Sequence, residues 1–144
     1  MMLAALISAL AAIIASSGAI ILTKAKEREA LWRAKKLAYY EEFFGAASGI
    51  VGLATPADAK VRFANAVNNL HLIASSDVIS ALHKFTDEIA EGNAAIFTKE
   101  RHDQLWSDLV WQIRSDLGDP PGQRTLFRAK LWASGTGTNV SPAK

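Results

Sequence analysis

The side chains best suited to metal or acid–base chemistry are three histidines, His71, His83 and His102. None of them lies at the spacing of a known zinc motif such as HExxH. His83 and Asp87 share a helix face at i,i+4, and so do Asp87 and Glu91. A solvated acidic face explains these residues better than a carboxylate–histidine metal site, which needs three or more converging ligands. The sequence therefore predicts no metal site and no cofactor.

Nucleophilic catalysis finds no support in this chain, which has no cysteine and no GxSxG sequence. Ser75 and Ser76 are typical of helix caps rather than of nucleophiles. The turn at residues 74–77 joins two short helices and imitates a helix-turn-helix. The second of these helices, however, carries one lysine and four acidic residues and would repel phosphate. We expect no catalytic residue and no nucleic-acid partner.

Two features indicate a contact surface instead. A tryptophan sits on the polar side of its predicted helix, and a basic-aromatic segment, residues 120–132, follows that helix. This segment either lies on an anionic membrane or docks on the acidic side of the folded domain, where it would cover the tryptophan. The candidate contact residues are Trp111, Arg124, Phe127, Arg128, Lys130 and Trp132.

Charge divides the chain into four blocks. Residues 1–23 carry none, residues 24–36 carry six basic and two acidic side chains, residues 37–119 carry six basic and twelve acidic, and residues 120–144 carry four basic. The net charges of the last three blocks are therefore +4, −6 and +4. Because the basic charge lies outside the acidic middle, the overall charge of +2 does not indicate nucleic-acid binding.

The uncharged stretch 1–23 predicts a single transmembrane helix, since about 20 apolar residues cross a bilayer core. A signal peptide cleaved near Ala15-Ser16-Ser17 and a buried core helix are the alternatives. The basic block after the stretch resists export, so the positive-inside rule places the N-terminus outside and residues 24–144 in the cytoplasm. A stripe of small residues in the span favours helix pairing, although such spacings also arise by chance. The stripe is Ala4, Ser8, Ala12 and Ser16, and the juxtamembrane basic residues are Lys24, Lys26, Arg28, Arg33, Lys35 and Lys36.

Helical periodicity continues to residue 117 without any strand-like alternation. A long helix from Lys24 to about Ala54 carries a wide apolar face that runs from Trp32 and Leu37 through the aromatic residues that follow. Further helices begin at Thr55-Pro56, after Ser75-Ser76 and near Thr98, and the last ends at Gly118. We therefore predict an all-α protein, with an antiparallel bundle of about four helices over residues 37–119 and a disordered tail over 133–144.

The stretch WRAKKLAYYEEFFGAASGI after a span, together with the closing IRSDLG at 113–118, resembles small single-pass bacterial inner-membrane proteins of unassigned function with a cytoplasmic helical domain. The resemblance covers most of the chain up to Gly118. It implies a bacterial or phage origin and an inner-membrane location, and it carries over no catalytic residue.

The sequence favours a non-enzymatic, membrane-anchored helical module that binds a protein partner or itself, because it offers many apolar faces and no convergent polar site. The expected partners are the lipid bilayer, an unidentified protein and a second copy of the chain. A small membrane-active protein, toxin-like or holin-like, is the first alternative. An enzyme with an unrecognised site is the second.

Overall fold

The structure is a computed structural model that describes residues 2–50, 55–93 and 95–132, with the side chains of all of these except 2–18 and Glu91. It divides into two units, residues 1–35 and residues 36–144. The predicted tail 133–144 lies outside the described residues.

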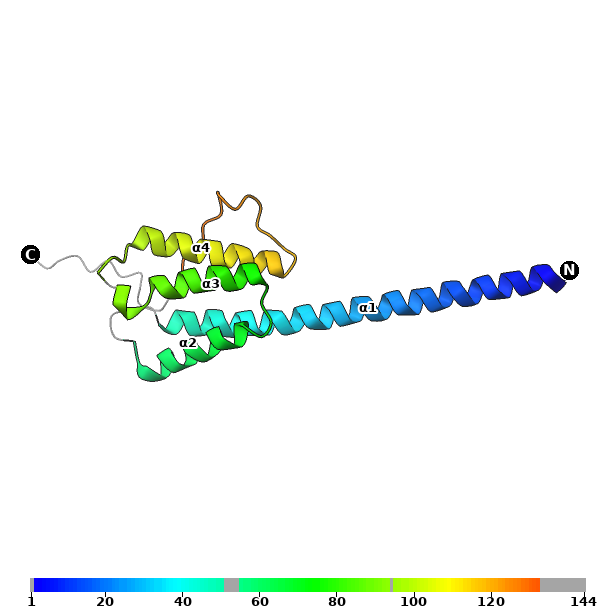
Figure 1. Cartoon of the computed structure of the whole chain (residues 1–144), viewed down its shortest axis with the longest axis horizontal. Coiled ribbons are helices and arrows are strands. Elements are labelled where there is room, and N and C mark those ends of the chain that lie inside the picture. Colours follow the sequence, from blue (N-terminus) through cyan, green and yellow to red (C-terminus); the bar gives the residue numbers. More distant parts are fainter. Residues whose placement is uncertain (1, 51–54, 94, 133–144) are drawn as a thin grey trace, which may run out of the picture. The chain divides into compact units, whose positions relative to one another are not determined.

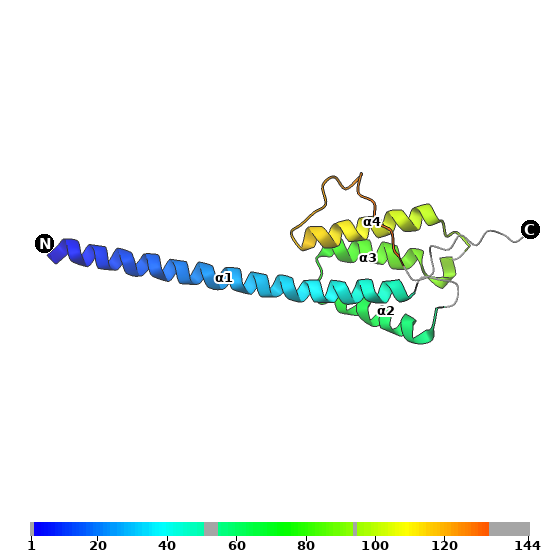
Figure 2. The same ribbon diagram turned by 180° about the vertical axis from the view of Figure 1, so that it is seen from behind.

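The described residues form four α-helices and one 3-10 turn, without a strand among them. The helices are α1 (Met2–Gly49), α2 (Ala57–Leu70), α3 (Ser76–Glu88) and α4 (Lys99–Asp116), and the 3-10 turn η1 is Glu91–Asn93. In the second unit the C-terminal part of α1 and helices α2 to α4 lie side by side, each running opposite to the one before it (Figure 1), and Figure 2 shows the same arrangement from behind. The prediction of an all-α bundle is confirmed.

Large aromatic side chains form the centre of the bundle. The ring of Trp106 from α4 stacks on Phe43 of α1 at 6.2 Å between centroids and meets Phe85 of α3 at 5.2 Å. All four helices contribute buried residues to this core. They are Tyr40, Phe43, Ala46, Ala47, Ala66, Leu70, Ile73, Val78, Ala81, Leu82, Phe85, Trp106, Leu109 and Ile113. Trp32 and Leu37, which the sequence placed on the apolar face of α1, are 47% and 45% exposed, so the core begins at Tyr40.

Local hydrogen bonds set most of the helix ends. Ser75 and Thr98 each accept a hydrogen bond from the backbone N–H three residues later, at 3.4 and 3.3 Å. Gly118, at φ 81°, ends α4. Its backbone N–H donates to the carbonyl of Ser115, and the N–H of Asp119 donates to the carbonyl of Arg114, both at 2.9 Å. The helix that the sequence starts at Thr55-Pro56 begins at Ala57 without a side-chain cap, because its cap position is Pro56, which has no side-chain oxygen to accept a bond. The Thr55 hydroxyl instead donates to the Ile50 carbonyl at 3.1 Å.

The first unit is helical from Met2 onward, and every side chain described in it, residues 19–35, is exposed. Among the described residues, no helix combines the length and the apolar character needed to cross a membrane. The small-residue stripe Ala4, Ser8, Ala12 and Ser16, and the alternative cleavage site at Ala15-Ser16-Ser17, lie outside the residues whose side chains are described.

Candidate interaction surface

Lys36, expected among the basic residues beside a membrane, is bound within the bundle. Its ammonium nitrogen lies 2.9 Å from each carboxylate oxygen of Asp116, at the end of α4, and its side chain is 15% exposed. The buried Tyr40, one turn later in α1, donates its hydroxyl to the same carboxylate. Burial, and then this hydrogen bond, raise the pKa of Tyr40 above its usual value of 10.0, so the hydroxyl stays protonated and remains a donor.

The other five basic residues of this block are exposed and lie in the first unit. Arg33 pairs with Glu29 at 3.0 Å along the helix, and the Lys35 ammonium lies 5.8 Å from the centre of the Trp32 ring. Lys24, Lys26 and Arg28 project from the helix as exposed side chains. Ion pairs as exposed as that of Arg33 contribute little to stability, so these five cations remain available to anions in their surroundings.

The segment after α4 is fixed to the bundle first at Arg124. Its guanidinium makes two hydrogen bonds to the carboxylate of Asp108, at 2.8 and 2.7 Å, and lies 5.6 Å from the centre of the Trp111 ring. The Trp111 indole N–H in turn donates to the carbonyl of Gly122 at 3.4 Å. The side of Trp111 that the sequence left open is thus covered by the segment itself.

Charge reinforces this first attachment. The hydrogen bonds from Arg124, and to a lesser degree the nearby charge of Lys84, lower the pKa of the Asp108 carboxyl, against an opposing effect of partial burial. The same hydrogen bonds raise the pKa of Arg124. Both groups are therefore charged at neutral pH, and the pairing is a charge-assisted, two-bond contact of the kind that fixes geometry as well as adding energy.

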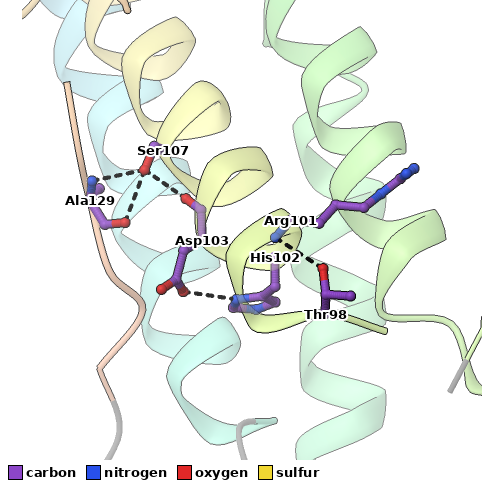
Figure 3. A network of polar contacts seen from close by, with 6 residues as sticks. All are labelled: Thr98, Arg101, His102, Asp103, Ser107 and Ala129. Carbon is purple, nitrogen blue, oxygen red and sulfur yellow. Dashed lines mark hydrogen bonds and ion pairs between the residues drawn. The ribbon is translucent and has the colours of Figure 1, made fainter. Parts of the chain in front are cut away.

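The second attachment is at Ser107, whose side chain is buried in α4 (Figure 3). Its hydroxyl accepts a hydrogen bond from the backbone N–H of Ala129 at 2.9 Å. The carbonyl oxygens of Asp103 and Ala129 lie 2.6 and 3.0 Å from the same hydroxyl, which has one hydrogen to donate to one of them. A small hydroxyl on α4 therefore holds the backbone of the segment against the helix.

From Leu126 to Trp132, exposed and partly buried side chains alternate along the segment. Phe127, Ala129 and Leu131 are partly buried, and the latter two pack against the core. Arg128 and Lys130 between them are exposed, and so are Leu126 before them, at 75%, and Trp132 after them, at 70%. These four exposed side chains, here called the outer row, are Leu126, Arg128, Lys130 and Trp132.

The outer row combines two apolar and two basic side chains on a backbone that is held in place. Arg128 donates to the carbonyls of Thr125 and Phe127, at 3.0 and 2.8 Å, and no carboxylate pairs with it or with Lys130 among the described residues. The row thus joins a tryptophan and an arginine, two residue types that are enriched in protein interfaces, with a net positive charge.

An open hollow between α1 and α2 has a volume of about 520 Å³. The ion pair between Arg62 and Glu42, at 3.0 Å, lies at its wall. Its other lining residues are Asp58, Val61, Asn65, Ala66 and Asn69. No nucleophile with an adjacent base is among them, so the hollow does not have the arrangement of a catalytic site.

The third histidine, His102, lies between the rings of Phe85 and Phe97, with its Nδ1 3.3 Å from Asp103. It sits at the edge of the core and is partly buried. Within the described residues no three His, Cys, Asp or Glu side chains come together as metal ligands.

Comparisons with models of protein families, with curated proteins and with solved structures find no match to this chain. Its geometry is therefore the basis for proposing a function.

Two contacts of the second unit were missed by reasoning from the sequence. Lys36 and Asp116 are 80 residues apart, and Ser107 and Ala129 are 22 residues apart. Helical spacing shows which residues share a face of one helix, but it does not show which faces meet. A partial signal existed for Lys36, because it lies one turn before Tyr40 and so shares the side of α1 that enters the core.

Proposed function

We propose that this chain is a membrane-anchored, non-enzymatic helical module that binds a protein partner through the outer row of its C-terminal segment. Residues 1–23 serve as a single-pass anchor in a bacterial inner membrane, and the bundle lies in the cytoplasm. The partner offers an acidic surface with an apolar pocket for Trp132.

The observation that carries this proposal is the outer row itself. Two large apolar side chains, each at least 70% exposed, lie at the two ends of the row. The two cations between them pair with no carboxylate among the described residues, and the segment is held at Arg124 and at Ala129. Apolar side chains exposed to water do not stabilise the folded chain. Because their backbone is already fixed before binding, less conformational entropy is lost when a partner binds.

The anchoring part rests on the charge pattern of the sequence. The first 23 residues carry no charge and six basic side chains follow within the next 13. Such a pattern favours insertion with the basic side in the cytoplasm. The exposed Ile20, Ile21 and Leu22 at the end of the uncharged stretch are consistent with an apolar surrounding there.

A photoreactive amino acid at position 126 tests the proposal in living cells. Leu126 belongs to the outer row, whereas the equally apolar Val61 on α2 is 59% exposed and serves as the matched control. The proposal predicts a protein adduct from position 126 that position 61 does not give, and its loss when Arg128 and Lys130 are both changed to Glu.

Each other outcome has a definite meaning. An adduct with twice the mass of the chain identifies the partner as a second copy. Adducts with lipid alone at position 126 would mean that the outer row lies on the bilayer, and the protein-binding proposal would be wrong. Equal protein adducts from both positions would also contradict it.

A further inference from the structure

Two histidines that are 12 residues apart in the sequence meet on the surface of the bundle. His71 follows the last residue of α2, and His83 lies in the middle of α3. Their Nε2 atoms are 2.9 Å apart and their ring centres 5.2 Å apart. Both side chains are exposed, so solutes can reach the space between α2 and α3 at this point.

The protonation of His71 follows from its second contact. Its Nδ1 lies 3.0 Å from the carbonyl oxygen of Val67. A carbonyl oxygen only accepts hydrogen bonds, so Nδ1 carries the hydrogen and Nε2 of the neutral ring has a free electron pair. That pair accepts the hydrogen on Nε2 of His83 when nothing else is bound.

We propose that His71 and His83 together bind a divalent transition-metal ion of the copper(II) or nickel(II) class through their Nε2 atoms. Neutral imidazole is the commonest metal ligand in proteins. The bond from His71 Nδ1 to a backbone carbonyl is the arrangement that orients most metal-binding histidines and makes them more basic. This site is independent of the outer row and of the proposed function.

In the metal-free pair the two nitrogens face each other. The ring centres are 5.2 Å apart and the Nε2 atoms 2.9 Å apart, so the two rings meet head-on, as in a hydrogen bond. To bind one ion, the exposed His83 ring turns about its side-chain bonds until both Nε2 electron pairs point at the ion. Nitrogen ligands hold copper(II) and nickel(II) more tightly than the earlier divalent metals of the first transition row, which favours this class of metal.

Binding of the ion by the two histidines needs no further reactant. The hydrogen on His83 Nε2 passes through water to Nδ1 of the same exposed ring, which frees Nε2 to bind the ion. Water completes the coordination, since no third His, Cys, Asp or Glu joins the pair within the described residues. The ion then links the end of α2 to α3, and it stabilises the folded chain by mass action.

The experiment titrates the full chain, purified in detergent micelles without an affinity tag, with Cu²⁺ alone and with Ni²⁺ alone. Isothermal titration calorimetry is expected to give one ion per chain. His71→Ala and His83→Ala should each weaken binding about tenfold or more, because each removes one of two protein ligands. His102→Ala is the matched control, as it removes the third histidine, and it should leave the affinity unchanged.

Unchanged binding in the His71→Ala, His83→Ala double variant would overturn the proposal, and so would loss of binding in His102→Ala alone. A spectroscopic measurement needs no variant. The electron paramagnetic resonance spectrum of the Cu²⁺-loaded full chain should show coupling to two imidazole nitrogens, and coupling to only one would contradict the site.

Discussion

The two units of this protein differ in what surrounds their side chains. Every side chain described in the first unit, residues 19–35, is exposed, including Ile21 and Leu22 at 68% and 65%. In the second unit Phe43, Phe85 and Leu109 are fully buried. One unbroken helix, α1, contributes to both.

This difference shows that the same secondary structure has two different origins in one chain. From Tyr40 onward α1 is stabilised by tertiary packing, because its apolar face is covered by the other helices. Before Lys36 no other helix covers it in the described residues. Its apolar side chains therefore either lie in another apolar environment or stay in contact with water, which is unfavourable. The comparison predicts that substitutions of similar size have very different effects in the two units.

The largest effect is expected from Phe43→Ala. The ring of Phe43 is fully buried and lies against Phe63 and Trp106, at 5.8 and 6.2 Å between centroids. Residues 24–144 alone should unfold cooperatively, and the substitution should lower their free energy of unfolding by about 3–5 kcal/mol. Urea unfolding followed by circular dichroism measures it.

Leu31→Ala is the matched control in the first unit, where the side chain is 72% exposed. It should change the free energy of unfolding by less than about 0.5 kcal/mol. Similar losses from the two substitutions would remove the distinction between the units.

Asp116→Asn should have the next largest effect. It removes the charge that pairs with Lys36 and accepts from Tyr40, and the side chains of both charged partners are largely buried. We expect a loss of about 2–3 kcal/mol, since a hydrogen-bonded cation is left without its counter-charge. Asp119→Asn, at a side chain that is 79% exposed and paired with Arg114, is the control and should cost far less. The thermal melting temperatures of the two variants give the comparison.

Arg124→Gln should have a smaller effect, because its ion pair with Asp108 is partly exposed. A loss of about 1 kcal/mol is expected, with the Arg128→Gln variant unchanged because Arg128 bonds only to backbone carbonyls. Hydrogen exchange at the amide of Ala129 should become faster in Arg124→Gln alone. Equal exchange in both variants would mean that Arg124 does not hold the segment.

The pair of Asp108 and Arg124 also predicts a dependence on pH. The folded-state pKa of Asp108 is lowered, so its contribution is complete above its ordinary pKa of 3.8 and is lost as the pH falls through the lowered value. The difference in melting temperature between the unsubstituted chain and Arg124→Gln should therefore be constant near neutral pH and disappear in acid. A difference that stays the same in acid strong enough to protonate this carboxylate would assign the effect to something else.

Reasoning from the sequence located the helices well because their signals are local. Ser75 and Thr98 marked the starts of α3 and α4 through their own hydrogen bonds. Gly118 likewise marked the end of α4, since its positive φ is a property of one residue and its neighbours.

The same reasoning failed where two distant segments meet. His83 was considered with Asp87 at i,i+4, whereas its observed partner is His71 on another helix. Lys36 was grouped with the basic residues before it, although its partner Asp116 lies in α4. The outer row was also hidden, because the side chains of this segment that face the bundle depend on where its backbone is attached, and Ser107 attaches it here.

The central claim, that an anchor and a self-sufficient bundle share one chain, is tested most directly by fractionating cells that express the full chain or residues 24–144. Membranes are washed with alkaline carbonate, which releases proteins that are not inserted. The account predicts that the full chain stays in the membrane pellet and that residues 24–144 are found in the soluble fraction. Release of the full chain by carbonate, or retention of residues 24–144 in the washed membranes, would contradict it.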